Sequence, residues 1–329
     1  MTCLEQHTIC VDMGTTNTRV WLLCGDQIVA SSKQAAGVRV SAREGSTGKV
    51  KSVLQEMILE VLESAGDVHQ ADSIAAAGMI TSSLGLKEIP HVLAPAGLSE
   101  LADAAQWHYF REISNLPFLL VPGVRTATDN NSTLDVMRGE ETLCVGLVES
   151  DFIESHSVVL NLGSHWKAIE VDGRGRICSS VTSLSGELID AARNQTVLAS
   201  SLPHQFPQEL GWKWVERGMS EARLTNLPQT LFRIRLLELD KEGSAEERLA
   251  FLVGALVATD LDALIARGVF RNKQIVLMGN RAIGECWRRA LEQKSINSLL
   301  LSAEETDRAF LKGLQQVVTQ APTYNRRNS

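Results

Sequence analysis

The feature that most constrains this chain of 329 residues is a pattern of strand, polar turn and strand that occurs twice. The first copy is "ICVDMGTTNTRVWLL" at 9–23, and the second is "SVVLNLGSHWKAIEVDGRGRICSSV" at 157–181, where a third strand follows. Helical segments come after each copy, and a chain of this length exceeds what a single hydrophobic core usually supports. We therefore expect two similar α/β domains, residues 1–134 and residues 135–329.

Helices and buried strands alternate through the rest of the chain. From Ser46 the apolar residues recur at intervals of three and four, which predicts an amphipathic helix that is capped at Ser46 or Thr47 and ends at Gly66. The short apolar runs at 73–80 and 117–123 predict buried strands. Further helices are expected near residues 135–149, 184–201, 228–239, 245–267, 280–294 and 303–319. This alternation indicates the α/β fold class.

Composition limits the possible partners. The net charge of -7 and the pI of about 5.6 disfavour nucleic acid and anionic membranes as partners, because both require a basic protein face. No apolar stretch reaches the roughly 18 residues of a membrane-spanning helix. The N-terminal "MTCLEQH" lacks the pattern of a signal peptide, so we expect a cytoplasmic protein. The six cysteines have no C-x-x-C spacing, which predicts reduced thiols rather than a zinc site.

The two polar turns are richer in glycine, hydroxyl and amide groups than a hairpin requires. Glycine lets backbone N–H groups approach an anion closely, and hydroxyl groups add donors. We expect both turns to bind one polyphosphate, with Asp12 holding Mg²⁺ through water. An ordinary hairpin is the alternative, and it is the stronger interpretation for the second turn taken alone. The predicted phosphate ligands are Gly14, Thr15, Thr16 and Asn17 in the first turn and Gly163, Ser164 and His165 in the second.

A third nucleotide-binding element is expected at 273–291, where a buried strand is followed by Gly279, Asn280 and a helix. Nucleotides bind beyond the carboxyl ends of strands in this layout. Gly279 would let an adenosine lie against the backbone. The alternative is an ordinary strand and helix unit with no ligand.

Four strings of the sequence resemble one family. "VDMGTTNTRVWLL", "DVMRGEET", "NLGSHWKAIEVDG" and "SLSGEL" are similar, in order and spacing, to the 2-dehydro-3-deoxygalactonokinases of the actin, hexokinase and heat-shock-chaperone ATPase superfamily. The resemblance runs over nearly the whole chain. It implies two ribonuclease-H-like domains around an interdomain ATP cleft, and transfer of the γ-phosphoryl group of ATP to a 2-keto-3-deoxy sugar acid with Mg²⁺. The chain departs from the family's pattern at Thr81 and Leu86, which bears on sugar specificity.

The catalytic base is expected in "TATDNNSTLDVMRGEETLCVGL", where several carboxylates gather. Asp135 lies where a helix is expected to begin, so its alternative role is a helix cap. The related exopolyphosphatases have a similar element, a glycine followed by two glutamates, whose first glutamate acts in catalysis. By this resemblance Glu140 is the catalytic residue. The alternative is that Glu140 is a solvated residue of a helix. Both Asp135 and Glu140 remain candidates, and Asp129 is the next candidate.

Recognition of a sugar acid requires local positive charge in an acidic chain. Arg138 could grip a carboxylate with both arms of its guanidinium, or it could pair with the acids beside it. Lys167 could meet a phosphate or the substrate carboxylate, and Glu187 could accept from sugar hydroxyls at a helix start. The expected substrate-binding set is Arg138, Glu141, Lys167, Gly78, Met79, Gly186 and Glu187.

Three functions compete at this point. The family resemblance favours phosphorylation of the 6-hydroxyl of 2-dehydro-3-deoxy-D-galactonate, a step of galactonate catabolism. A kinase for a related acid such as 2-dehydro-3-deoxygluconate, or a phosphatase or nucleotide hydrolase of the same fold, is the alternative. A scaffold that binds nucleotide without catalysis is disfavoured because the carboxylates are present. The sequence does not predict the oligomeric state.

Overall fold

The structure is a computed structural model that describes residues 7–66, 71–126, 134–153 and 156–324. Contacts between Cα atoms divide the chain into two compact units. Unit 1 comprises residues 1–152, 174–179 and 307–329, and unit 2 comprises 153–173 and 180–306. These contact units do not follow the predicted boundary after residue 134, because the segment to residue 152 and the C-terminal helix both pack within unit 1.

Unit 1 is built on a six-stranded sheet of order β3-β2-β1-β4-β7-β6. β1 pairs antiparallel with β2, β2 pairs antiparallel with β3, and β1 pairs parallel with β4. The strands are β1 (His7–Met13), β2 (Thr18–Cys24), β3 (Gln27–Gln34), β4 (Ser73–Gly78), β6 (Gln106–Tyr109) and β7 (Pro117–Leu120). The strand and polar turn predicted at 9–23 is therefore the β1–β2 hairpin.

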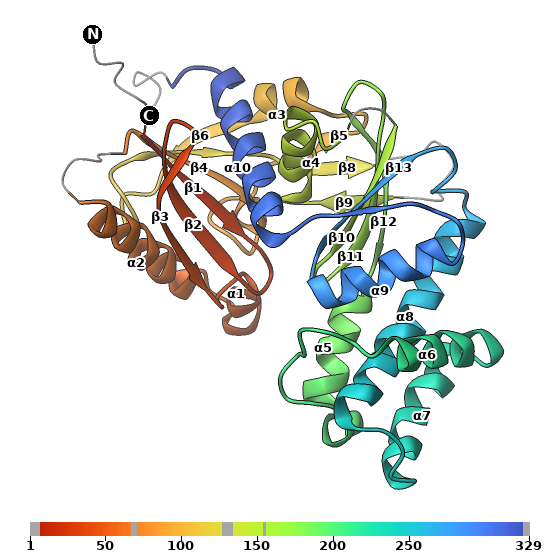
Figure 1. Cartoon of the computed structure of the whole chain (residues 1–329). Coiled ribbons are helices and arrows are strands. Elements are labelled where there is room, and N and C mark those ends of the chain that lie inside the picture. Colours follow the sequence, from red (N-terminus) through yellow and green to blue (C-terminus); the bar gives the residue numbers. More distant parts are fainter. Residues whose placement is uncertain (1–6, 67–70, 127–133, 154–155, 325–329) are drawn as a thin grey trace. The chain divides into compact units, whose positions relative to one another are not determined.

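The predicted helix after Ser46 is confirmed as α2 (Gly48–Ala65), with Thr47 at its N-cap and Gly66 at its C-cap. Its apolar stripe, which includes Leu54 and Ile58, packs into the core on the sheet, and Figure 1 shows the helix beside β3. The other helical elements of unit 1 are α1 (Arg39–Glu44), the 3-10 turn η1 (Met79–Thr81), α3 (Leu98–Ala104), α4 (Glu140–Glu149) and α10, which extends from Ala303 in unit 2 to Gln320.

A second, three-stranded sheet corrects one expectation. Residues 135–149 were expected to form a helix, but Asp135–Met137 form β9, which pairs with β8 (Val124–Thr126) beside β5 (Val92–Leu93). The helix α4 begins only at Glu140, because Gly139 has φ +104°, a conformation that no helix contains. Asp135 is therefore not a helix cap.

α4 and α10 approach each other closely at two glycines, and Figure 1 shows the two helices next to each other in unit 1. A Cβ on Gly146 would lie 1.6 Å from the carbonyl oxygen of Ala309, and a Cβ on Gly313 would lie 2.0 Å from that of Thr142. Only glycine permits this approach of the two backbones. These contacts fix α4 against α10.

Unit 2 repeats the strand order of unit 1. Its sheet runs β12-β11-β10-β13-β14, with β10 antiparallel to β11 and parallel to β13. The strands are β10 (Ser157–Leu162), β11 (Trp166–Val171), β12 (Ile177–Ser183), β13 (Gln274–Gly279) and β14 (Leu299–Leu300). In both sheets the strands that follow the first three run parallel to the first strand, apart from the antiparallel edge strand β6 in unit 1. This is the ribonuclease-H-like arrangement, so the expected fold is confirmed for both sheets.

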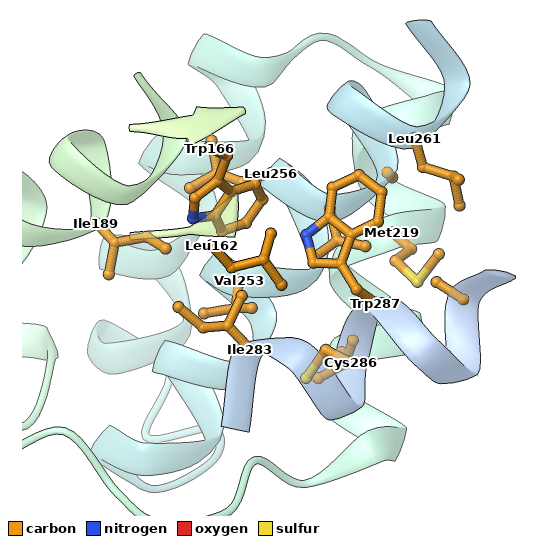
Figure 2. Packing of buried hydrophobic residues seen from close by; sticks show 14 of the residues in the cluster. Leu162, Trp166, Ile189, Met219, Val253, Leu256, Leu261, Ile283, Cys286 and Trp287 are labelled. Carbon is orange, nitrogen blue, oxygen red and sulfur yellow. The ribbon is translucent and has the colours of Figure 1, made fainter. Parts of the chain in front are cut away.

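A layer of helices completes unit 2 (Figure 1). They are α5 (Ser185–Gln195), the 3-10 helix η2 (Val197–Ser201), α6 (Trp212–Leu224), α7 (Leu227–Leu239), α8 (Ala245–Ala266) and α9 (Arg281–Glu292). The sequence did not predict α6. Figure 2 shows the core that these helices share with the sheet, where the rings of Trp166 and Trp287 meet edge to face at 5.7 Å between centroids.

The helix α8 corrects the expectation that no stretch could span a membrane. By length and composition α8 alone passes that test among the described residues, with a mean hydropathy of 2.0. In the structure 67% of that window is buried, and α6 and α7 pack against it. Backbone contact with α6 is close, since a Cβ on Gly254 would lie 2.0 Å from the carbonyl oxygen of Val215. The apolar composition of α8 is explained by its position in the core of unit 2.

Candidate active site

The candidate site of unit 1 lies where parallel strands β1 and β4 end. Asp12 is near the end of β1, Gly78 is the last residue of β4, and Gly139 caps α4. A Cβ on Gly139 would lie 3.3 Å from the Cα of Gly78 and 3.9 Å from Oδ1 of Asp12. Ligands of α/β proteins bind at this edge of a sheet. The structure thus brings together residues that the sequence separates by 127 positions.

Asp12 is held by a residue that the sequence analysis did not single out. Arg19 lies directly opposite Asp12 in the β1–β2 pairing, and both Nε and Nη2 donate to Oδ2 of Asp12, at 3.1 and 2.5 Å. The other oxygen, Oδ1, faces Gly78, whose Cβ would be 3.3 Å away. The signal was available in the sequence, because a hairpin with its turn at Gly14–Asn17 places Asp12 and Arg19 on facing positions.

The first polar turn is held in place by the segment that follows β3. Gly14 donates its N–H to the carbonyl of Asn17 at 2.8 Å, and the N–H groups of Val38 and Arg39 donate to the carbonyls of Gly14 and Thr15. A Cβ on Gly37 would lie 2.4 Å from the carbonyl oxygen of Gly14, so the segment that follows β3 lies directly on the turn. Thr15 and Thr16 are half-buried and Asn17 is exposed.

The two candidate bases occupy different places. Glu140 is the first residue of α4, next to Gly139, and its Oε2 accepts from the N–H of Arg138 at 3.2 Å. Asp135 begins β9, pairs with Thr126 across the small sheet, and accepts from the N–H of Val136 at 2.9 Å. Glu140 is therefore the candidate that is adjacent in the chain to the cluster of Asp12, Gly78 and Gly139. Asp129 lies outside the described residues.

Glu141 does not fit the substrate contact expected for it, because its side chain has no exposed surface. Both of its carboxylate oxygens lie 2.8 Å from the backbone nitrogen of Gly139 and accept from its N–H, so the buried carboxylate stabilises the turn that precedes α4. Burial, with the neighbouring Glu140, raises the pKa of Glu141 to about 8. Glu141 is therefore a buried acid that orders Gly139.

The guanidinium of Arg138 contacts other residues of unit 1. Its Nη1 donates to the hydroxyl of Thr81 at 2.8 Å, and its Nη2 donates to the carbonyl of Ile89 at 2.8 Å and lies 3.4 Å from Nδ1 of His91. The hydroxyl of Thr81 donates to the carbonyl of Gly78 at 3.0 Å, so the guanidinium fixes the segment after β4, including Met79. Burial lowers the pKa of Arg138. These contacts use Nη1 and Nη2.

In unit 2 the second polar turn meets the start of α5. A Cβ on Gly186 would lie 2.1 Å from the carbonyl oxygen of Gly163 and 2.6 Å from that of Ser164, so only glycine allows this contact. His165 and Glu187 pair at 3.2 Å across it. The turn and the first residues of α5 therefore form one structural element.

Two further polar groups support that element. Lys167 is only 4% exposed and donates to the hydroxyl of Thr182. Asp260 on α8, which the sequence analysis missed, accepts from the hydroxyls of Ser183 and Ser185 at 2.5 and 2.8 Å, and burial raises its pKa. Nothing local in the sequence connects Asp260 with residues more than 70 positions earlier.

The strand and helix predicted at 273–291 are confirmed as β13 and α9. Gly279 has φ +108°, and a Cβ there would lie 2.7 Å from the carbonyl oxygen of Leu162, the last residue of β10. The side chain of Asn280 accepts from the N–H of Ile283, so it caps α9. A pocket of about 680 Å³ opens beside this cap, and its wall includes Trp212 and Arg289.

The carboxylate oxygens of Asp12 are suitable ligands for a magnesium ion that keeps most of its water. Among the described residues no three His, Cys, Asp or Glu side chains gather as a metal site. A single carboxylate with phosphate oxygens and water is the usual environment of Mg²⁺ in phosphoryl transfer. Oδ1 of Asp12 faces two glycines, Gly78 and Gly139, where side chains would otherwise fill the space. The residues present therefore fit the ion.

Comparison with known proteins agrees with this geometry. Residues 12–317 match the family described as 2-keto-3-deoxy-galactonokinase. The 2-dehydro-3-deoxygalactonokinase of Escherichia coli (strain K12) is 27% identical over 317 residues, which are 94% of this chain and 96% of that protein. The solved structure of a candidate 2-dehydro-3-deoxygalactonokinase from Sinorhizobium meliloti has a TM-score of 0.74 at 24% identity and covers 94% of this chain and 98% of that chain.

The fold extends beyond sugar kinases. The activator of the 2-hydroxyisocaproyl-CoA dehydratase from Clostridium difficile, solved with bound ADPNP, has a TM-score of 0.52 at 13% identity over 96% of both chains. These likenesses confirm the actin-like ATPase fold expected from the sequence. The chain belongs to the 2-keto-3-deoxy-galactonokinase family, whose members are carbohydrate kinases that use ATP.

Proposed function

We propose that the protein transfers the γ-phosphoryl group of ATP to the 6-hydroxyl of 2-dehydro-3-deoxy-D-galactonate. The observation that carries this proposal is the cluster of unit 1, in which Asp12, Gly78 and Gly139 converge and Glu140 adjoins Gly139 at the start of α4. Phosphoryl transfer requires a site for the metal and the phosphates, and a carboxylate that receives the acceptor proton. The family supplies the identity of the acceptor.

In the proposed reaction the bond between the γ-phosphorus and the bridging oxygen of ADP breaks, and a bond from the sugar O6 to that phosphorus forms. The proton of the 6-hydroxyl passes to the carboxylate of Glu140, which we favour over Asp135 because of its place beside Gly139. A bound Mg²⁺ neutralises phosphate charge. Asp12 would hold that ion through water, and the positive end of the α4 dipole favours anionic groups nearby.

The two polar turns are proposed to hold phosphate oxygens, as their glycine and hydroxyl groups suggest. Gly279 and Asn280 would meet the nucleoside, and the adjacent pocket of about 680 Å³ has a size typical of small-molecule sites. Its Trp212 and Arg289, with 5.6 Å between the guanidinium and the ring centroid, offer a flat apolar face and a cation to the base or ribose.

The carboxylate of the sugar acid needs a cation. Arg138 holds the segment 78–91 in place through Nη1 and Nη2. We propose that its third nitrogen, Nε, binds the carboxylate of the substrate. Gly78 and Met79 would then form part of the sugar site. Gly186 and Glu187 stay proposed as substrate contacts in unit 2, whereas the burial of Lys167 and its bond to Thr182 leave it a supporting role there. Because ATP is an intracellular metabolite, we propose the cytoplasm as the location.

A coupled assay of ADP release tests the function. The galactonate and gluconate epimers of the keto-deoxy acid are compared with glucose and glycerol as acceptors, and ATP alone measures hydrolysis. We expect the galactonate epimer to be the best acceptor and the neutral compounds to be rejected, since they offer no carboxylate to the half-buried Arg138. Equal activity on a neutral sugar would refute the sugar-acid assignment, and a preference for the gluconate epimer would refute only the epimer.

A further inference from the structure

We propose that Asp307 of α10 is a positioning residue: it turns Arg19 so that one oxygen of Asp12 stays open to the metal that accompanies ATP. The inference rests on the proposed function of Asp12. It concerns three side chains of unit 1, all described in the structure. Asp307 is 288 residues from Arg19, and no sequence motif connects them.

The described contacts between Arg19 and Asp12 involve only one oxygen of the carboxylate. A guanidinium usually grips a carboxylate with two parallel bonds, one to each oxygen. Here Nε and Nη2 of Arg19 both donate to the same oxygen, Oδ2 of Asp12. Oδ1 is left facing Gly78 and Gly139. This is the oxygen that a metal, or a water of its shell, would meet.

Asp307 explains that geometry. Nη1 of Arg19 donates to Oδ1 of Asp307, so the guanidinium is drawn toward α10 while its other edge holds Asp12. The helix is itself fixed to the hairpin, because Phe310 packs on Trp21 at 6.1 Å between ring centroids. Arg19 lies over the same Trp21 ring, 5.4 Å from its centroid. Without Asp307, a small rotation would let Arg19 take both oxygens of Asp12 and compete with the metal.

The effect of position can be separated from the effect of charge. Asp307→Asn removes the negative charge but keeps an oxygen that can accept from Nη1 of Arg19. Asp307→Ala removes both. If Asp307 acts by positioning, the asparagine variant stays close to the wild type and the alanine variant does not. If it acts only by charge, the two variants behave alike.

Two affinities are measured. Electron paramagnetic resonance of bound Mn²⁺ gives the affinity of the ATP complex for Mn²⁺, and calorimetry in the presence of EDTA gives the affinity for metal-free ATP. We expect Asp307→Ala to weaken Mn²⁺ binding to the ATP complex about 10-fold, the scale seen when a second partner of a metal ligand is lost. Affinity for metal-free ATP should change less than about 2-fold, because Asp307 does not act on the phosphates. Adding Arg19→Lys to Asp307→Ala should restore Mn²⁺ binding, since an ammonium group cannot grip two oxygens in a fork.

The matched control is Asp262→Ala, which breaks an arginine–aspartate pair with Arg223 at 2.7 and 2.9 Å in unit 2 and should leave Mn²⁺ binding unchanged. Equal losses in the asparagine and alanine variants, or an equal loss of metal-free ATP affinity, would overturn the positioning role. If the wild type itself gains no ATP affinity from Mn²⁺, the metal role of Asp12 in the proposed function fails, and this inference fails with it.

Discussion

Replacing Glu141 by glutamine should make the protein more resistant to alkaline pH. The wild-type side chain is fully buried, and its pKa is raised from 4.5 to about 8 by burial and by Glu140. Between these two values the folded chain keeps a proton that the unfolded chain has released. Stability then falls as pH rises, so the contribution of Glu141 is fully present below pH 4.5 and is lost by about pH 8.

The size of the effect follows from that interval. It spans about 3.5 pH units, and each costs about 1.4 kcal/mol, which sets an upper limit of about 5 kcal/mol. Water that enters when the carboxylate ionises reduces this cost, so we expect about 2 to 4 kcal/mol. In Glu141→Gln the amide oxygen can still accept from the N–H of Gly139, 2.8 Å away in the wild type, while no group titrates.

The assay is urea unfolding at pH 5 and pH 8.5, followed by circular dichroism. The free energy of unfolding of the variant minus that of the wild type should increase by about 2 to 4 kcal/mol between these pH values. Glu149→Gln, at the exposed end of the same helix, is the control and should show little change with pH. If the free energy of unfolding of Glu141→Gln minus that of the wild type changes by less than about 0.5 kcal/mol between pH 5 and pH 8.5, the reasoning is refuted.

Two predictions concern the nucleotide and the base. ATP with Mg²⁺ at a hundredfold excess over its dissociation constant should stabilise the folded protein by about 2.7 kcal/mol, and a melting curve that does not move would contradict binding. Glu140→Gln should lower turnover by about 100-fold to 10,000-fold with nearly unchanged ATP affinity, whereas Asp135→Asn should retain most activity. The opposite ranking in single-turnover kinetics would assign the base to Asp135, and two fully active variants would exclude both residues.

The elements that the sequence predicted well were those with local signals. α2 has a regular apolar stripe and a terminal glycine, and β10, β11 and β12 are divided by the turns at 163–165 and 172–176. β13 and α9 were also clear, because Gly279 and Asn280 are a natural strand end and helix cap. Each of these signals lies within a few residues of the structure that it specifies.

The errors arose where contacts between distant residues decide the structure. A helix was expected to begin at Asp135, with a helix cap as the alternative role of that residue, but pairing with Thr126 holds Asp135 in β9 and α4 begins only after the turn at Gly139. Glu141 was expected to contact the substrate, but packing in unit 1 buries its side chain completely. Asp260 and Asp307 act on partners 75 and 288 residues away, a relation that a single sequence does not display.

The central claim is tested most directly by identifying the product. The enzyme is incubated with Mg²⁺, ATP and 2-dehydro-3-deoxy-D-galactonate, and the phosphorus spectrum is followed by nuclear magnetic resonance with carbon coupling to locate the new ester. The account predicts one phosphate monoester on O6 of the sugar acid, formed in equal amount with ADP and only when the acceptor is present. Inorganic phosphate released at the same rate with or without the acceptor would contradict it.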